Sequence, residues 1–183
     1  MRYEQTIWGQ REVKGKIFGK SLTFRLVVLP LPPSVNKKVE PNYAAIRHMM
    51  NTGSGYKGLV KNSTEYNSWV NFARTQLMKK KLPSYEGQIF CSICFVFKDK
   101  TKNDVDNRIK PLLDSFTQSK CLIKDDNDVK TLVATKMVIP KTEVVIAVVV
   151  KLDDMQGTGF QELMLNESFV KKLLCQDGKT EQK

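Results

Sequence analysis

The residues with the clearest chemical potential are carboxylates that lie in two groups between positions 104 and 128. Asp104 and Asp106 stand where a charged turn meets a helical segment, and Asp125, Asp126 and Asp128 come just before an apolar segment. Eight of the eleven acidic residues in positions 21–152 fall between positions 99 and 143. Hard divalent cations such as Mg²⁺ take oxygen ligands, usually a few carboxylates with waters and substrate phosphates. The two groups therefore indicate a cation site.

A lysine accompanies the carboxylates on the predicted helix. Asn107, Lys110 and Asp114 follow Asp106 at helical spacing, on the face opposite the apolar residues of the same segment. A structural interpretation competes with the chemical one, because aspartates before helices are good N-caps and turns favour Asp and Asn. Both interpretations stay open at this point.

The net charge is strongly positive. Thirty Lys and Arg against nineteen Asp and Glu give +11; positions 21–152 alone carry +10, positions 1–20 carry +3 and positions 153–183 carry −2. A field of one sign on a small domain favours a polyanionic partner. A carboxylate cluster inside a basic surface suits metal-assisted phosphodiester cleavage, because the bases hold the backbone and the acids hold the metal that activates water.

Several other chemistries lack the residues they need. Cys91 and Cys94 form a CxxC pair without a second pair, and we expect them to point to opposite faces of one strand, which argues against structural zinc. The single histidine, His48, makes nucleophilic triad chemistry improbable. No glycine-rich phosphate loop supports nucleotide binding. Met137 stands where an EF-hand that starts at Asp126 needs a glutamate.

The order of the apolar segments predicts an α+β (mixed α/β) domain. Apolar, β-rich runs predict strands over 21–29, 88–97, 131–139 and 143–152, the last two joined at 140–142 as a hairpin. Helical periodicity predicts helices over 62–81, capped by Asn62, and over 108–118. The expected fold is a small mixed sheet of about four strands in β-α-β-α-β-β order, with helices packed on it.

The length of 183 residues suits one domain with tails. Positions 21–152 are the expected domain, positions 1–20 a basic extension that is either an arm or a peripheral hairpin, and positions 153–183 a tail with an amphipathic helix. Positions 37–61 are expected to be a long loop, which is usually functional or disordered. No apolar run approaches the roughly 18 residues of a membrane span and no signal peptide is evident, so a cytoplasmic protein is expected.

Three segments resemble the RusA family of Holliday-junction resolvases. Leu29–Asn36 (LPLPPSVN) resembles the family's opening strand and turn, and Asp104–Asp114 (DVDNRIKPLLD) resembles its central D-x-D-N-x-x-K-x-x-x-D segment. Leu122–Val129 (LIKDDNDV) resembles the later acidic pair before a strand, and Lys136 matches a recurrent lysine in the next strand. The resemblance covers positions 24–152, and it implies that positions 21–152 form a RusA-like nuclease domain.

The resemblance implies a homodimeric, Mg²⁺-dependent endodeoxyribonuclease, with Mn²⁺ as a substitute ion, that nicks four-way DNA junctions symmetrically. Its catalytic and metal-binding carboxylates would be Asp104, Asp106 and Asp126, with Asp125 assisting at the metal and Lys110 as the catalytic lysine. The protein would serve recombination, repair or phage DNA processing in the cytoplasm of a bacterial or phage-infected cell. We expect it neither to bind a membrane nor to use a nucleotide cofactor. A phage or prophage source is expected.

Residue chemistry leads to the same mechanism. The carboxylates would hold one or two Mg²⁺ ions that polarise the scissile phosphate and lower the pKa of a bound water, and Lys110 would stabilise the developing charge. Other basic side chains would bind the backbone without reading its sequence. These DNA-binding candidates are Lys79, Lys80, Lys81, Lys98, Lys100, Lys102, Arg108 and Lys136.

Two alternatives remain. A non-catalytic basic DNA-binding or architectural protein would share the charge but would not need the carboxylate groups. A metal-dependent nuclease acting on flaps or forks would share both. Two active sites in a C2 dimer would match the symmetry of paired nicks, and the apolar residues of strand 131–139 and of the tail helix are candidate dimer surfaces.

Overall fold

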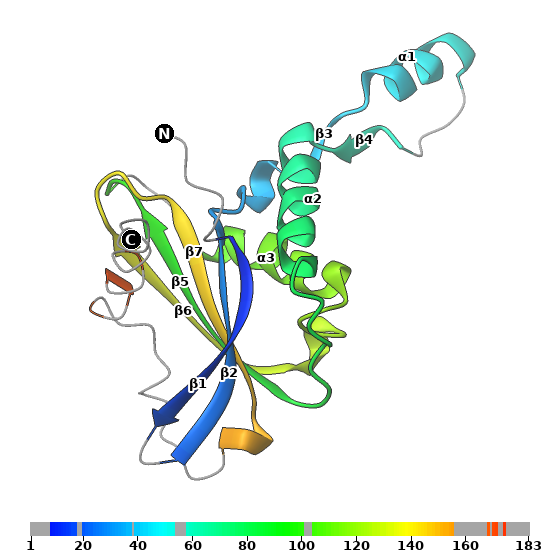
Figure 1. The fold of residues 1–183 in the computed structure, drawn as a ribbon. Coiled ribbons are helices and arrows are strands. Elements are labelled where there is room, and N and C mark those ends of the chain that lie inside the picture. The colour runs from blue at the N-terminus through cyan, green and yellow to red at the C-terminus, as the bar shows by residue number, and fades with distance from the viewer. Residues whose placement is uncertain are drawn as a thin grey trace.

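The computed structural model contains a five-stranded sheet, two helices against one of its faces, and a projecting segment that carries a third helix (Figure 1). It describes residues 8–17, 20–37, 39–53, 58–100 and 104–155, and then Ser168, Val170, Lys171 and Leu174. The helices are α1 (Tyr43–Thr52), α2 (Thr64–Met78) and α3 (Asp106–Ser119), with short 3₁₀ helices η1 (Val35–Lys37), η2 (Asp126–Asp128) and η3 (Asp153–Met155). The strands are β1 (Gly9–Ile17), β2 (Lys20–Pro30), β3 (Val39–Pro41), β4 (Val60–Asn62), β5 (Ile89–Phe97), β6 (Val129–Val138) and β7 (Val144–Lys151).

The main sheet is mixed, in the order β1-β2-β7-β5-β6. Every neighbouring pair is antiparallel except β5 and β6, which are parallel. A parallel pair needs a crossover connection, which α3 supplies between β5 and β6. The predicted α+β class is therefore confirmed, with five strands in this sheet where about four were expected.

Burial explains the strand order. β5 is buried at every position, and β7 is buried from Val144 to Val150. A strand that is covered on both faces carries apolar residues throughout and belongs in the interior of a sheet. β6 alternates between partly buried and exposed residues, as suits an edge strand. The predicted hairpin of the last two strands is wrong, because β5 lies between β6 and β7.

The two faces of the sheet carry separate apolar cores. On the first face, β2, β5 and β7 pack against α2 and α3 through residues such as Leu77 and Phe116. On the second face, the same strands pack against Val170 of the tail, which is fully buried. Cys91 belongs to the first core and Cys94 to the second, which confirms that their side chains point to opposite faces.

The helix α2 begins one residue later than the sequence predicted. Asn62 was expected to cap it, but Ser63 is the N-cap residue, and its hydroxyl accepts a hydrogen bond from Tyr66 N at 3.2 Å. The helix ends at Met78. The Ser63 hydroxyl therefore satisfies the amide of the third helical residue, as an N-cap side chain does.

The predicted loop over positions 37–61 is wrong for the residues described there. β3 and β4 pair antiparallel, and α1 lies between them. Asn42 Oδ1 accepts a hydrogen bond from Ala45 N at 3.3 Å at the start of α1, and Gly53, at φ 67°, ends it. We call residues 39–53 and 58–62 the arm; α1 stands away from the sheet in Figure 1.

The first strand falls within the positions expected to be an extension, and of the two alternatives the structure contains the hairpin, because β1 pairs with β2. Its anchor is Gln10, which is 2% exposed. Gln10 Nε2 donates to the carbonyls of Leu77 (2.8 Å) and Cys121 (3.1 Å). These bonds tie the edge strand to the C-terminal ends of α2 and α3.

The predicted tail helix lies mostly outside the described residues. The four tail residues that are described are helical, and Val170 and Leu174 pack on the second face of the sheet. Within the described ranges, no helix is both long enough and apolar enough to cross a membrane.

Candidate active site

The first carboxylate group lies at the N-terminal end of α3. Asp104 and Asp106 are exposed, and the cap position between them is Val105, which makes no side-chain capping bond. N-capping therefore does not account for either aspartate. Asp104 Oδ2 accepts a hydrogen bond from Asn107 Nδ2 at 3.4 Å. Asp106 lies in the first turn, where the helix dipole favours a negative charge.

Lys110 links this helix to the second carboxylate group. It follows Asp106 by four residues, so both lie on one side of α3. Its Nζ lies 3.0 Å from Asp114 Oδ1 and 3.1 Å from Asp126 Oδ2. Because Asp126 begins η2, the lysine connects α3 to the segment that leads into β6. The structure thus brings two of the candidate site residues, Lys110 and Asp126, together.

The ion pairs set the charge states of these groups. Hydrogen bonds to Asp114 and then to Asp126 raise the pKa of Lys110 above its ordinary value. The hydrogen bond and the charge of Lys110 lower the pKa of Asp126 below its ordinary value. Both groups are therefore ionised at neutral pH. About half of the Lys110 side chain is exposed, so the cation remains accessible to a phosphate from solvent.

Asp114 and Tyr66 complete the cluster, and the sequence analysis assigned neither to the site. Tyr66 OH donates to Asp114 Oδ2 at 2.7 Å, from α2 to α3. Burial and this hydrogen bond raise the pKa of Tyr66 far above its ordinary value, so the phenol keeps its proton. The sequence showed the helical spacing of Asp114 from Lys110 and its place at the end of the family-like segment 104–114. It gave no sign that Tyr66 would meet Asp114.

Asp125 has a structural role. Its Oδ1 accepts a hydrogen bond from Asn127 N at 2.8 Å and so caps η2. This bond holds the turn that presents the neighbouring Asp126. The capping interpretation thus applies to Asp125.

The donor set suits a hard divalent cation in chemical type. Within the described part of the chain, no three Asp, Glu, His or Cys side chains form a group that could hold a metal ion. Mg²⁺ usually binds through one or two carboxylates and completes its shell with waters and substrate phosphates. The two exposed aspartates at the start of α3, and the partly exposed Asp126 that Lys110 links to this helix, supply carboxylate oxygens of that type.

Two basic candidates, Arg108 and Lys136, lie against Phe97, the last residue of β5. Arg108 lies over its ring at 5.4 Å from the centroid, and Lys136 lies at 5.3 Å. Arg108 also donates to the carbonyl of Pro32 and lines a surface cavity of about 350 Å³ with Trp69. Burial lowers the pKa of this arginine. Arg108 therefore fixes the start of α3 to the proline-rich turn after β2.

The remaining basic candidates are placed apart from this cluster or are not described. Lys98 is exposed and pairs with Glu143 at 3.3 Å, and Lys100 is exposed nearby in sequence. Lys102 lies outside the described residues. Lys79, Lys80 and Lys81 follow α2, where Lys80 lines a cavity with residues of β1. Lys80 is 14 residues beyond Tyr66, which corresponds to about 20 Å along a helix.

Comparison with known families agrees with this geometry. The family model described as endodeoxyribonuclease RusA matches residues 32–149, which is more than half of the chain and includes both carboxylate groups, Lys110 and the crossover from β5 to β6. A search of curated proteins finds no match to the chain. The resemblance seen in the sequence is confirmed: the chain belongs to the RusA family of endodeoxyribonucleases.

Proposed function

We propose that this endodeoxyribonuclease resolves four-way DNA junctions by paired, symmetric nicks, as a divalent-metal-dependent homodimer. The observation that carries the proposal is Lys110, whose ammonium lies between Asp114 and Asp126 on the side of α3 that begins with Asp106. A cation surrounded by carboxylates, inside a domain of net charge +10, suits a site that handles phosphate and metal together.

Asp104, Asp106 and Asp126 would hold the metal, which we expect to be Mg²⁺, with Mn²⁺ as a substitute and Asp125 assisting. When bound, such an ion polarises a phosphate and lowers the pKa of a water molecule. Neither Asp104 nor Asp106 caps the helix. Carboxylates that are exposed and do not cap the helix support this assignment, because N-capping does not explain them.

Lys110 would stabilise negative charge on the reacting phosphate. A preorganised cation acts without the cost of reorienting water, which is why such groups contribute strongly to catalysis. Its two carboxylate partners hold the side chain in place. Tyr66, through Asp114, would act as a positioning residue for that lysine.

Basic residues near the start of α3 would hold the DNA backbone. Arg108 and Lys136 lie against the ring of Phe97, and Lys98, Lys100 and Lys102 follow β5 in the segment that leads to α3. Contacts of this kind position the backbone and carry no sequence information. Lys79, Lys80 and Lys81 would contact DNA farther from the carboxylates.

A nicking assay on synthetic four-way, flap and linear duplex substrates, with Mg²⁺ or with EDTA, tests the proposal. The expected result is metal-dependent, paired cleavage of the four-way junction and little cutting of the linear duplex. Preferential cutting of flaps would replace the proposed substrate with the alternative nuclease. Binding without cutting under every metal condition would overturn the catalytic assignment.

A further inference from the structure

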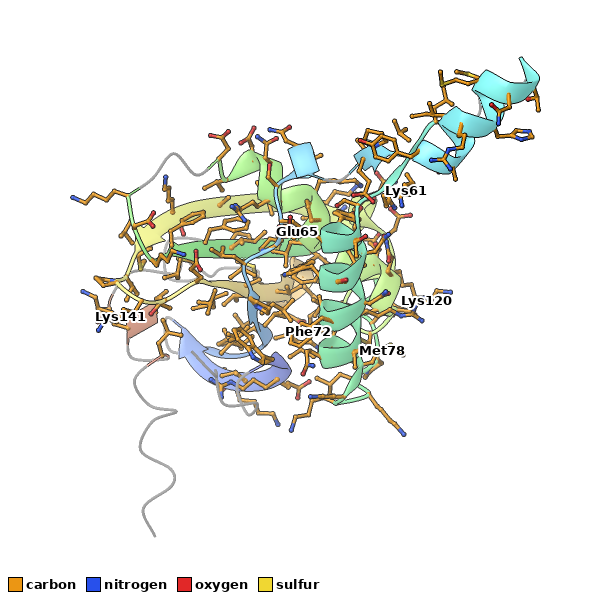
Figure 2. The ribbon with its side chains drawn as sticks, turned by 90° about the horizontal axis from the view of Figure 1, so that it is seen from above. Lys61, Glu65, Phe72, Met78, Lys120 and Lys141 are labelled. Atoms are coloured by element: carbon orange, nitrogen blue, oxygen red, sulfur yellow. The ribbon has the colours of Figure 1, made fainter. Side chains whose placement is uncertain are left out.

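The arm is the part of the described structure that the proposed cleavage chemistry leaves unused. Its helix, α1, has no buried residue. Figure 2 shows α1 and its side chains standing clear of the sheet and of α2. Large apolar side chains are exposed along the arm, with Tyr43 at 73% and Met50 at 76%, together with Val39 and Val60.

The arm is nevertheless built as a defined element. Asn42 caps α1, Gly53 ends it, and Lys61 pairs with Glu40 at 3.4 Å across the two short strands. An isolated helix of ten residues is marginal in water, because helix formation has a costly nucleus and needs tertiary packing. A capped helix with no buried residue in the described structure is therefore expected to gain its packing from a partner.

The charge of the arm selects the kind of partner. No acidic residue occurs between Glu40 and Glu65, whereas Arg47, Lys57 and Lys61 are basic. Glu40 itself pairs with Lys61, so the acid at the base of the arm is neutralised. A basic segment whose one acid is paired with a lysine complements a polyanion. The chain as a whole is also strongly basic, so a second copy would oppose the arm with charge of the same sign.

The position of the arm links it to the carboxylates. Its base follows the turn at positions 31–37, and Arg108, two residues after Asp106, donates to the carbonyl of Pro32 in that turn. The 3₁₀ helix η1 also packs near α3. The arm therefore leaves the body from the end of α3 that carries Asp104 and Asp106.

We propose that the arm binds the DNA duplex that flanks the scissile phosphate, with Arg47 on the sugar–phosphate backbone and the exposed side chains of Tyr43 and Met50 against the groove or the bases. This inference rests on the proposed function. Apolar and aromatic side chains do pack between or against bases in other DNA-binding surfaces. The surface thus combines a cation for phosphate with apolar area for the bases.

The reach of the arm sets the region it contacts. Three-residue strands add about 10 Å and a ten-residue helix adds about 15 Å. At about 3.4 Å per base pair, the arm would contact DNA on the order of 5–10 base pairs from the cut. The proposal therefore predicts where protection should appear, as well as that it should appear.

Gel-shift titrations on a four-way junction in EDTA test the arm without requiring cleavage. Arg47→Ala should weaken binding and lower the slope of log affinity against log salt by about 1. Tyr43→Ala with Met50→Ala should weaken binding at least about 5-fold. Lys14→Ala is the control, because Lys14 is an exposed basic residue on β1, and β1 is an edge strand of the main sheet, to which α1 does not belong. It should leave both measurements near the wild-type values.

Hydroxyl-radical footprinting adds the position of the contact. Wild-type protein should protect base pairs 5–10 from the cut, and the Tyr43/Met50 variant should lose that protection while keeping protection beside the cut. Unchanged affinity and footprint in every arm variant would overturn the inference. A change of oligomeric mass in these variants, with DNA binding intact, would assign the arm to contacts between copies instead. Wild-type protein that binds with this footprint but never cuts would support the arm and overturn the proposed function.

Discussion

A substitution at Asp106 tests whether this carboxylate has a catalytic role or a structural one. Asp106→Asn keeps the shape of the side chain and removes its charge, and the helix does not use Asp106 as its cap. We expect cleavage to be abolished and junction binding to be unchanged or tighter, because a negative charge that repels phosphate is lost. Parallel gel-shift and cleavage measurements, with circular dichroism to check the fold, provide the test. Cleavage near the wild-type rate would remove Asp106 from the site.

Lys110 allows a second test of the same cluster. Lys110→Ala should lower the single-turnover cleavage rate on the order of 100-fold, since one preorganised electrostatic group typically contributes about 3 kcal/mol to transition-state binding. Junction affinity should change much less, because other bases hold the backbone. Lys110→Arg should restore only part of the rate, because a planar guanidinium does not replace a compact ammonium.

Two further measurements control the lysine result. Lys124→Ala removes a lysine with a similar exposed ion pair, to Glu86 at 2.6 Å, and should cut at the wild-type rate. In Lys110→Ala, the pKa of Asp126 should rise toward its ordinary value of about 4, because the hydrogen bond and the charge that lower it are gone. Carboxyl NMR titration measures that shift. A cleavage rate within about threefold of wild type would make Lys110 part of a solvated surface, whose ion pair stabilises a helix by at most about 0.5 kcal/mol.

The pH behaviour of this pair follows from the two pKa directions. Asp126 has a lowered pKa, so the contribution of its charge to stability is present above about pH 4 and lost as pH falls through the lowered value. Lys110 has a raised pKa, so its contribution is present below about pH 10.4 and lost as pH rises through the raised value. The pair is therefore charged throughout the neutral range.

Residue type and spacing predicted only part of the site. Asp104, Asp106 and Lys110 lie close together in the sequence, just before α3 and in its first two turns. Their proximity could therefore be predicted from their spacing alone. The bond between Tyr66 and Asp114 joins two helices 48 residues apart. Periodicity reports which face of a helix is apolar and says nothing about which polar group meets it from another element, so that contact required the structure.

At the scale of elements, composition misled in two places. The polar stretch before α2 contains a capped helix, which was missed because α1 has no buried face to produce a clear apolar signal. The order of the last strands was also wrong, because short connections favour hairpins. The residue types of the strands indicate the sheet order better than the short connection does. The continuous apolar runs of β5 and β7 require interior positions, and the mixed sequence of β6 suits an edge.

The first strand supplies a prediction of its own. Gly9 has φ 125°, and a Cβ there would lie 2.8 Å from the carbonyl oxygen of Gln76 in α2. Gly9→Ala combines that collision with backbone strain, so we expect a loss of stability of about 2 kcal/mol or more. Gly87→Ala is the matched control, because Gly87 has φ 89° with nothing within 4 Å of its Cβ position.

Urea unfolding of the two glycine variants measures the difference. Gly9→Ala should be clearly less stable than Gly87→Ala. Both variants place alanine in a strained backbone conformation, and only the Cβ at position 9 collides with the Gln76 carbonyl of α2. Equal losses would show that β1 moves away from α2 without cost, which would contradict the anchoring of the strand by Gln10.

At the scale of the whole molecule, the charge distribution governs binding to DNA. Positions 21–152 carry +10 and the last 31 positions carry −2. Counterion release makes affinity fall steeply with salt in proportion to the phosphates neutralised. A plot of log affinity against log salt concentration should therefore have a slope of several units. A nearly flat plot would mean that the positive charge is scattered over the surface and does not form a DNA footprint.

Paired nicking needs two active sites, so the last prediction concerns the assembly. β6 is an edge strand of the sheet, and it exposes Leu132 to 39%. The opposite edge, β1, is tied to α2 and α3 through Gln10. An exposed strand edge is a ready surface for pairing with another chain, and a C2 dimer would place two sites in the symmetry that a four-way junction requires.

Light scattering at micromolar concentration should give twice the 20.9 kDa of one chain. Leu132→Glu should lower that mass to one chain and convert paired cuts of a cruciform plasmid, which give a linear product, into single nicks, which give an open circle. Phe72→Glu is the matched control, since Phe72 is an apolar side chain of nearly equal exposure, 38%, on α2. It should remain a dimer with paired cutting. A one-chain mass for wild-type protein that still makes paired cuts would contradict the dimer, and a Leu132→Glu protein that stays dimeric would exclude β6 as its interface.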